Sequence, residues 1–134
     1  MSKTQVSVAV IDDDQDDLEI MEQVITGLDH EIKCSLFMYP QEAVDKLVDA
    51  AKRQLPDYIF IDINMPGLSG DKCLQIFRAN SAFDDVRIIM YSTSMPGKTA
   101  QQLRSAGADF VFEKPVRIQD YSEIIGTIVR QSLS

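Results

Sequence analysis

The sequence is poor in the residues that most often form metal sites and disulfides. It has no tryptophan, 1 histidine and 2 cysteines among 134 residues. Cys34 and Cys73 stand far apart without CxxC spacing, and His30 is the only other candidate zinc ligand of this kind. A zinc site or a disulfide is therefore disfavoured, and we expect both cysteines to be small buried side chains.

Long apolar runs and an excess of positive charge are also absent. No stretch approaches the roughly 20 apolar residues that a membrane-spanning helix needs, and the first residues, MSKTQ, contain no signal-peptide hydrophobic region. The chain has 13 basic and 21 acidic residues, which gives a net charge of -8. Binding to a nucleic-acid backbone requires clustered Lys and Arg. We therefore expect a cytoplasmic protein that binds neither membranes nor nucleic acid directly.

Size and composition are those of one ordinary globular domain. A chain of 134 residues with 45% hydrophobic and 25% charged residues can bury one substantial core but not two. The sequence contains no linker, repeat or low-complexity stretch. We therefore predict a single domain over residues 1–134.

Short apolar runs alternate along the chain with amphipathic segments. The apolar runs predict strands at residues 6–11, 32–36, 57–61, 86–91 and 110–112. Helical spacing predicts a helix through Leu18, Met21, Ile25 and Leu28, then helices at 41–53, 70–79 and 98–106, and a last one through 121–129. Five such β–α units predict an α/β fold with a parallel sheet and helices on both faces, because right-handed crossovers cover both sides of the strands.

Polar residues that could take part in a reaction follow four of these five strands. Asp12 and Asp13 follow the first strand, Asp62 the third and Ser92 the fourth, and the fifth leads to Lys114. In an open α/β sheet, function gathers outside the carboxyl ends of the strands. A single polar residue there would be ordinary loop chemistry, but the four ends together predict one site.

The residue types at this site favour phosphoryl chemistry. Three carboxylates at one edge repel one another unless a cation lies among them, and oxygen ligands with room for water suit Mg²⁺. Lys114 and Ser92 would contact phosphoryl oxygens, and Asp62 would be the nucleophile. An ionised carboxylate attacks without a general base, so it does not matter that His30, which precedes the second strand, is distant in sequence. The expected product is an aspartyl phosphate.

Four segments of the sequence resemble the receiver domains of two-component response regulators. They are VAVIDDD, IFIDINMPGLSG, IIMYSTS and GADFVFEKP, and the resemblance extends over essentially the whole chain. It implies a flavodoxin-like, doubly wound, five-stranded parallel sheet with strand order 2-1-3-4-5.

The resemblance also implies a role for each matching residue. Asp62 would accept the phosphoryl group, while Ser92 and Lys114 would hold its oxygens. Asp13 would bind Mg²⁺ directly, Asp12 would act largely through water, and the backbone carbonyl of Asn64 would complete the protein ligands together with Asp62. Asp14 extends the acidic run and is interpreted as a solvated acid near the start of the helix.

Three positions differ from the common pattern of the family. Ser92 replaces the usual Thr, and Thr93 stands where a small residue is usual, beside the path to the phosphoryl group. Val111 occupies the place of an aromatic residue that changes rotamer on activation. Phe110 and Phe112 flank it, but strand alternation puts them on the opposite side, where we expect them to be core residues.

Partners follow from the same resemblance. A histidine kinase or a histidine phosphotransfer protein would supply the phosphoryl group, and an unknown downstream protein would receive the signal. The residues after Pro115 suffice for one last helix, so we expect a stand-alone receiver that is either an output protein or a relay.

Two other functions stay open. A Mg²⁺-dependent phosphatase that works through an aspartyl phosphate would need a second Asp two residues after the nucleophile, where this chain has Asn64. A degenerate receiver that only binds a partner would be expected to lack one of the chemical residues. The expected protein is therefore not a turnover enzyme, although it catalyses its own phosphorylation and dephosphorylation.

Overall fold

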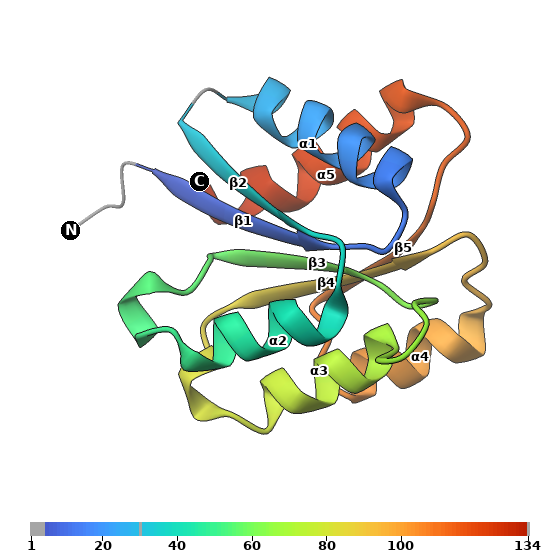
Figure 1. Cartoon of the computed structure of the whole chain (residues 1–134). Coiled ribbons are helices and arrows are strands. Elements are labelled where there is room, and N and C mark those ends of the chain that lie inside the picture. Colours follow the sequence, from blue (N-terminus) through green and yellow to red (C-terminus); the bar gives the residue numbers. More distant parts are fainter. Residues whose placement is uncertain (1–4, 30, 134) are drawn as a thin grey trace.

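The computed structural model of the chain describes residues 5–29 and 31–133, so that His30 lies outside the described residues. Strands and helices alternate along this part of the chain (Figure 1). The strands are β1 (Val6–Ile11), β2 (Ile32–Phe37), β3 (Tyr58–Asp62), β4 (Arg87–Ser92) and β5 (Phe110–Glu113). The α-helices are α1 (Gln15–Leu28), α2 (Pro40–Asp49), α3 (Gly70–Arg78), α4 (Gly97–Ser105) and α5 (Ile118–Leu133), with short 3-10 helices η1 (Lys52–Gln54) and η2 (Ser81–Phe83).

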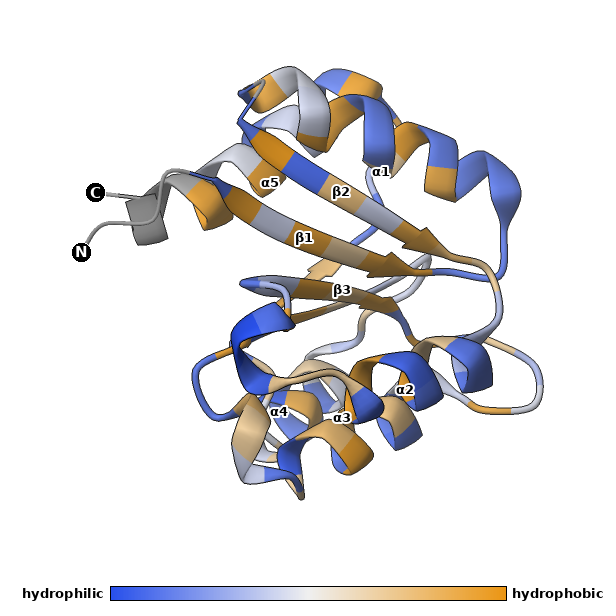
Figure 2. Cartoon of the chain, turned by 60° about the vertical axis from the view of Figure 1, so that its left-hand side comes forward, coloured by the Kyte–Doolittle hydropathy of each residue, from blue (hydrophilic) through white to orange (hydrophobic). Residues whose placement is uncertain are grey.

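The five strands form one sheet in the order β2-β1-β3-β4-β5, and all neighbouring strands are parallel. This confirms the predicted flavodoxin-like topology. β1 and β3 are central and apolar, as their orange colour in Figure 2 shows, whereas β2 is an edge strand with exposed Lys33. The strand order brings the ends of β1, β3 and β4 next to one another.

Helices cover both faces of the sheet. α1 and α5 lie side by side on one face, and α2, α3 and α4 lie on the other (Figure 1). Alternate residues of each strand therefore belong to two separate cores: Val8 and Val10 face α1 and α5, and Ala9 and Ile11 face the other three helices. In Figure 2 the helices carry their hydrophilic residues on the outside.

Among the element ends that differ from the predictions, two matter for the site and a third shortens a helix. Strands β3 and β4 each end one residue later than predicted, so Asp62 and Ser92 are the last residues of their strands and share the rigidity of the sheet. The helix predicted for residues 41–53 ends at Asp49, because Ala50 and Ala51 adopt extended backbone before η1 begins.

The end of the sheet opposite Asp62 is closed by Arg78, the last residue of α3. Its guanidinium donates to the carbonyl oxygens of Gly107, Phe83 and Val86 and to the carboxylate of Asp109, at 2.7–2.9 Å. One side chain thus joins four segments of chain.

The two cysteines are free: Cys73 is buried and Cys34 is half-buried. None of the helices within residues 5–29 and 31–133 is both long and apolar enough to cross a membrane.

Candidate functional site

Three carboxylates meet where β1 and β3 end. Asp12 and Asp13 follow β1, Asp62 ends β3, and one oxygen of each lies within 4.8 Å of the others. Asp12 is fully buried and Asp62 is 4% exposed, whereas Asp13 is only half-buried. The structure therefore brings the two acids that follow β1 together with the acid that ends β3.

The backbone at Asp62 is held by a close approach of α3. The amide of Gly70 donates to the carbonyl of Ile63 at 2.9 Å, and the amide of Ile63 donates to the carbonyl of Tyr91 at 3.0 Å. A side chain at position 70 would collide with the backbone carbonyl of Asp62, so glycine is required there. Asp62 consequently has little freedom to move relative to the sheet.

Burial changes the protonation of the acids. Loss of water and, secondly, the charge of Asp12 raise the pKa of Asp62 to about 7, although Lys114 opposes this shift. Burial also raises the pKa of Asp12, against the hydrogen bonds that Asp12 accepts from the backbone of Asp14 and from Tyr91. A cation among these carboxylates would favour their ionised forms and so oppose both upward shifts in pKa.

Tyr91 contacts Asp12 from β4. Its hydroxyl donates to Oδ2 of Asp12 at 2.8 Å, and its ring stacks on Phe112 with 5.4 Å between centroids. Burial and the nearby Asp12 raise the pKa of the Tyr91 hydroxyl well above its usual range, so the hydroxyl keeps its proton. Tyr91 was not among the site residues predicted from the sequence; its only signal was a hydroxyl near the end of an apolar strand.

Lys114 supplies the positive charge of the site. Its ammonium lies 2.7 Å from Asp17, 3.5 Å from Asp12 and 3.6 Å from Asp62. Burial opposes the charge on Lys114, but the hydrogen bond with Asp17 and the charges of Asp12 and Asp62 outweigh it and raise the pKa. Asp17 was interpreted in the sequence only as a helix-start acid, and its contact with Lys114 was not predicted.

Ser92 and Asn64 face each other across the site. The side-chain amide of Asn64 donates to Oγ of Ser92 at 2.8 Å, and the amide of Ser94 approaches the same oxygen at 3.5 Å. The sequence predicted a backbone role for Asn64, and its side-chain contact with Ser92 was not predicted. Thr93 lines the cavity next to Asn64, as expected of a residue beside the path to Asp62.

The start of α1 is fixed by Asp14. Its side chain accepts hydrogen bonds from the amides of Asp16 and Asp17 at 2.9 Å and 3.2 Å, which makes it the N-cap of the helix. Asp14 is thus an exposed acid at the helix start, in agreement with its interpretation from sequence.

These groups surround an open cavity of about 290 Å³. Its lining residues are Asp13, Asp14, Asp17, Asp62, Asn64, Thr93 and Lys114. The donor set consists of carboxylate oxygens with open space beside them, which fits a hard cation such as Mg²⁺ that retains several waters. A soft metal would find no suitable ligand among these lining residues.

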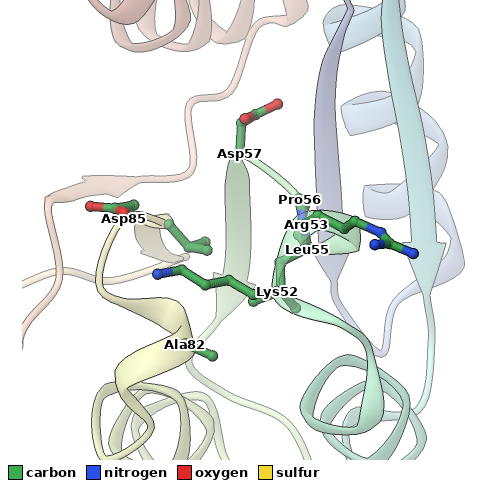
Figure 3. Close-up of a pocket in the computed structure, with 8 residues that line it drawn as sticks. Lys52, Arg53, Leu55, Pro56, Asp57, Ala82 and Asp85 are labelled. Carbon is green, nitrogen blue, oxygen red and sulfur yellow. The ribbon is translucent and has the colours of Figure 1, made fainter. Parts of the chain in front are cut away.

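A second cavity, of about 460 Å³, lies at the opposite ends of the strands. Its charged side chains do not converge: Lys52 extends toward Asp85, while Arg53 points the other way (Figure 3). Asp57 accepts a hydrogen bond from the amide of Ser7 at 2.8 Å and joins β3 to β1. We assign no chemistry to this cavity.

Curated relatives are response regulators. Stress response regulator protein 1 of Candida albicans is 28% identical over 113 residues, covering 84% of this chain and 39% of that protein. The two-component response regulator ARR9 of Arabidopsis thaliana is 27% identical over 139 residues, covering 92% of this chain and 59% of the relative. The chain thus spans only part of the relatives it matches.

Solved structures share the fold. The phosphorylated cyanobacterial phytochrome response regulator RcpA superposes with a TM-score of 0.85 at 16% identity, over 97% of this chain and 95% of that one. The chemotaxis protein CheY4 of Vibrio cholerae gives a TM-score of 0.77 at 21% identity, over 94% and 98%. The family model of the response regulator receiver domain matches residues 8–126. The chain therefore belongs to the response regulator receiver domain family, whose members are signalling modules.

Proposed function

We propose that the protein accepts a phosphoryl group on Asp62 from a histidine kinase or a histidine phosphotransfer protein. The observation that carries this proposal is the arrangement around Asp62: two further carboxylates on one side and the Lys114 ammonium on the other. A buried carboxylate beside a cation and an open cavity is placed to act as a nucleophile toward phosphorus.

In the proposed step, a carboxylate oxygen of Asp62 forms a bond to phosphorus. The bond from phosphorus to the donor breaks at the same time, and its electron pair leaves with the nitrogen of a phosphohistidine or the oxygen of a small phosphodonor. Lys114 and the Ser92 hydroxyl donate to phosphoryl oxygens, which stabilises the charge on them in the transition state. No general base is needed, because the ionised carboxylate has no proton to lose.

Asp12, Asp13, Asp62 and the backbone of Asn64 would hold Mg²⁺. When bound, the ion supplies positive charge that favours the ionised form of Asp62 and screens the phosphoryl oxygens from the carboxylates. Asp13, which is the more exposed acid of the β1 pair, would be the direct ligand, and buried Asp12 would act largely through water.

The signal would leave through a protein partner, in the cytoplasm, with this domain acting in output or in relay. The surface of α4, β5 and α5 is the proposed contact face. Within this face, a groove of about 390 Å³ is lined by residues of β5 and α5: apolar Phe110, Val111, Phe112, Ile124 and Ile128, and polar Glu123 and Thr127. A related solved structure is a CheX–CheY complex with beryllofluoride and Mg²⁺ from Borrelia burgdorferi (20% identity, TM-score 0.77, covering 92% of this chain and 89% of that one).

The test is phosphorylation by acetyl phosphate with Mg²⁺, followed by intact-mass spectrometry. Wild-type protein should gain one phosphoryl group transiently, and Asp62→Asn should gain none, since an amide cannot attack. Persistent labelling of Asp62→Asn would show that another residue accepts the phosphoryl group. Asp13→Asn, which leaves the nucleophile in place, should be labelled more slowly.

The same assay separates the two alternatives. A phosphatase would turn over small phosphate esters many times per molecule, and a binding module would acquire no label and hydrolyse nothing. The side-chain amide of Asn64 donates to Ser92, and an amide cannot serve as the acid or base that phosphatase chemistry requires.

A further inference from the structure

The shortest contact of the Lys114 ammonium involves a residue that the proposed phosphoryl transfer does not use. Nζ lies at hydrogen-bond distance from Oδ2 of Asp17, 2.7 Å, whereas Asp12 and Asp62 lie beyond it at 3.5 Å and 3.6 Å. The Lys114 side chain is only 9% exposed, so water can replace little of a lost partner. The orientation of the Lys114 ammonium therefore depends mainly on Asp17.

Asp17 is itself held in a fixed place. It lies in the first turn of α1, and its own amide donates to the N-cap side chain of Asp14 at 3.2 Å. At the other end, the backbone amide of Lys114 donates to the carbonyl of Ser92 at 2.8 Å. Lys114 is thus anchored at its backbone by β4 and at its ammonium by α1.

This anchorage matters for the nucleophile. At 3.6 Å the ammonium attracts Asp62 through its charge but does not donate a hydrogen bond to it. If Asp17 were absent, the ammonium could move onto Asp62 and engage the lone pair that has to attack phosphorus. The present arrangement leaves that lone pair available and leaves donor N–H groups of Lys114 for an incoming phosphoryl oxygen.

We propose that Asp17 is a positioning residue that holds the Lys114 ammonium off Asp62 and in place for the phosphoryl group. This inference rests on the proposed phosphoryl transfer and adds the residue that sets the geometry of its lysine. Asp17 acts through Lys114 and is not one of the three carboxylates, Asp12, Asp13 and Asp62, that would hold Mg²⁺.

The first test compares the rates of labelling of three variants by acetyl phosphate at saturating Mg²⁺. Asp17→Asn keeps the size of the side chain and removes its charge, and its labelling should be about tenfold slower, the loss expected for one charge-assisted hydrogen bond. Asp16→Asn makes the same charge change on the exposed neighbouring residue and should label at the wild-type rate. Asp17→Glu should recover part of the rate, because a carboxylate is restored.

A wild-type or faster rate for Asp17→Asn would overturn the proposal, since Asp17 would then be a bystander or a competitor for Lys114. Equal slowing by Asp17→Asn and Asp16→Asn would also overturn it, because the effect would come from net charge alone. The affinity for Mg²⁺, measured by thermal melting, should stay within about twofold of the wild-type value in all three variants. This change is much smaller than a tenfold change in affinity, which corresponds to about 1.4 kcal/mol.

A second test does not depend on phosphorylation. Lysine ammonium signals in ¹⁵N NMR spectra, with Lys114→Ala used for assignment, should show a shifted and faster-exchanging Lys114 signal in Asp17→Asn but not in Asp16→Asn. Unchanged signals in Asp17→Asn would refute the positioning role whatever the labelling result. A third outcome is that the signals change in Asp17→Asn but the wild type itself is never labelled. That outcome would refute the proposed function and leave the Asp17–Lys114 contact in place.

Discussion

The hydroxyl of Tyr91 donates a 2.8 Å hydrogen bond to Oδ2 of Asp12, and both side chains are buried. This bond links the end of β4 to the acid that follows β1 across the intervening strand β3. The bond stabilises the buried carboxylate of Asp12. Without it, Oδ2 of Asp12 would keep the charge of Lys114, at 3.5 Å, as its nearest described partner.

Tyr91→Phe should therefore destabilise the metal-free protein by about 1.5–3 kcal/mol, the range for a hydrogen bond to a charged group. The ring stack with Phe112 is retained in this variant. Tyr58→Phe is the matched control, because its buried hydroxyl donates to an uncharged carbonyl, that of Val129, and should cost about 0.5–1.5 kcal/mol. Urea unfolding at neutral pH measures both; equal losses would show that Asp12 does not depend on Tyr91.

Mg²⁺ should raise the melting temperature of the wild type, because the proposed site for the ion exists only in the folded chain. At a concentration 100-fold above its Kd the gain in the free energy of unfolding is about 2.7 kcal/mol. Asp13→Asn should reduce this gain while relieving repulsion in the metal-free protein. Asp85→Asn, at the opposite end of the sheet, should leave the gain intact. Unchanged melting of the wild type in millimolar Mg²⁺ would rule out the metal site.

The stability of the metal-free protein should depend on the ionisation of Asp62. Burial, with the charge of Asp12, raises the pKa of Asp62 from 3.8 to about 7, so the folded chain binds this proton more tightly than the unfolded chain. The stabilising contribution is complete below about pH 4 and is lost as the pH rises through 7.

Asp62→Asn lacks this titration. Its free energy of unfolding should therefore rise relative to that of the wild type as the pH increases from 4 to 8, by on the order of a few kcal/mol. Urea unfolding in a chelator across this range gives the difference. With saturating Mg²⁺ the wild type should instead become relatively more stable as the pH rises, since the ligands must be deprotonated. Parallel pH profiles for the two metal-free proteins would contradict the raised pKa.

Lys114→Ala should weaken phosphorylation without abolishing Mg²⁺ binding. It leaves Asp12 and Asp62 buried without their cation, a change that costs about 3–5 kcal/mol when the acids stay ionised. Mg²⁺ should therefore stabilise this variant more than it stabilises the wild type. Lys98→Ala, an exposed lysine of α4, serves as control. Melting curves and labelling together check this, and loss of the Mg²⁺ effect would assign Lys114 a part in holding the metal.

Activation should be reported mainly by the β4–α4 loop. Val111 is half-buried and packs against the core on the α4 side of the sheet, while Phe110 and Phe112 pack against the other core, as strand alternation predicts. Valine has one stiff torsion and no ring that could change place. Beryllofluoride with Mg²⁺ should therefore shift the backbone amides of residues 92–98 strongly and those of 110–112 slightly, as followed by NMR.

A matched variant tests the reason for this expectation. Val111→Tyr supplies the missing ring and should enlarge the response of β5 to beryllofluoride. One link between the two regions is already present, because the amide of Met95 donates to the side chain of Glu113 at 3.0 Å. Shifts along β5 in the wild type as large as those of the loop would show that this link, or a neighbouring phenylalanine, carries the switch instead.

The parallel sheet and the meeting of the acids could be predicted because they depend on short-range patterns, whereas the strand order 2-1-3-4-5 was implied only by the resemblance to receiver domains. Apolar runs of β-branched residues predict buried parallel strands, and parallel strands place their last residues at one edge. Asp12, Asp62 and Lys114 could thus be assigned to one site before any distance was known.

The partners of these residues could not be predicted in the same way. Tyr91 reaches Asp12 across a neighbouring strand, and Asp17 reaches Lys114 from a helix, so each contact depends on side-chain directions that spacing does not determine. The end of α2 at Asp49 was missed for a related reason: Ala50 and Ala51 have high helix propensity, and the extended backbone there is set by the path to β3.

The four-segment contact of Arg78 has a consequence for the dynamics of the whole molecule. By joining the end of α3, η2, the start of β4 and the turn before β5, it makes local opening costly at that end of the sheet. Any change of shape that phosphorylation of Asp62 causes should therefore leave this end of the sheet in place.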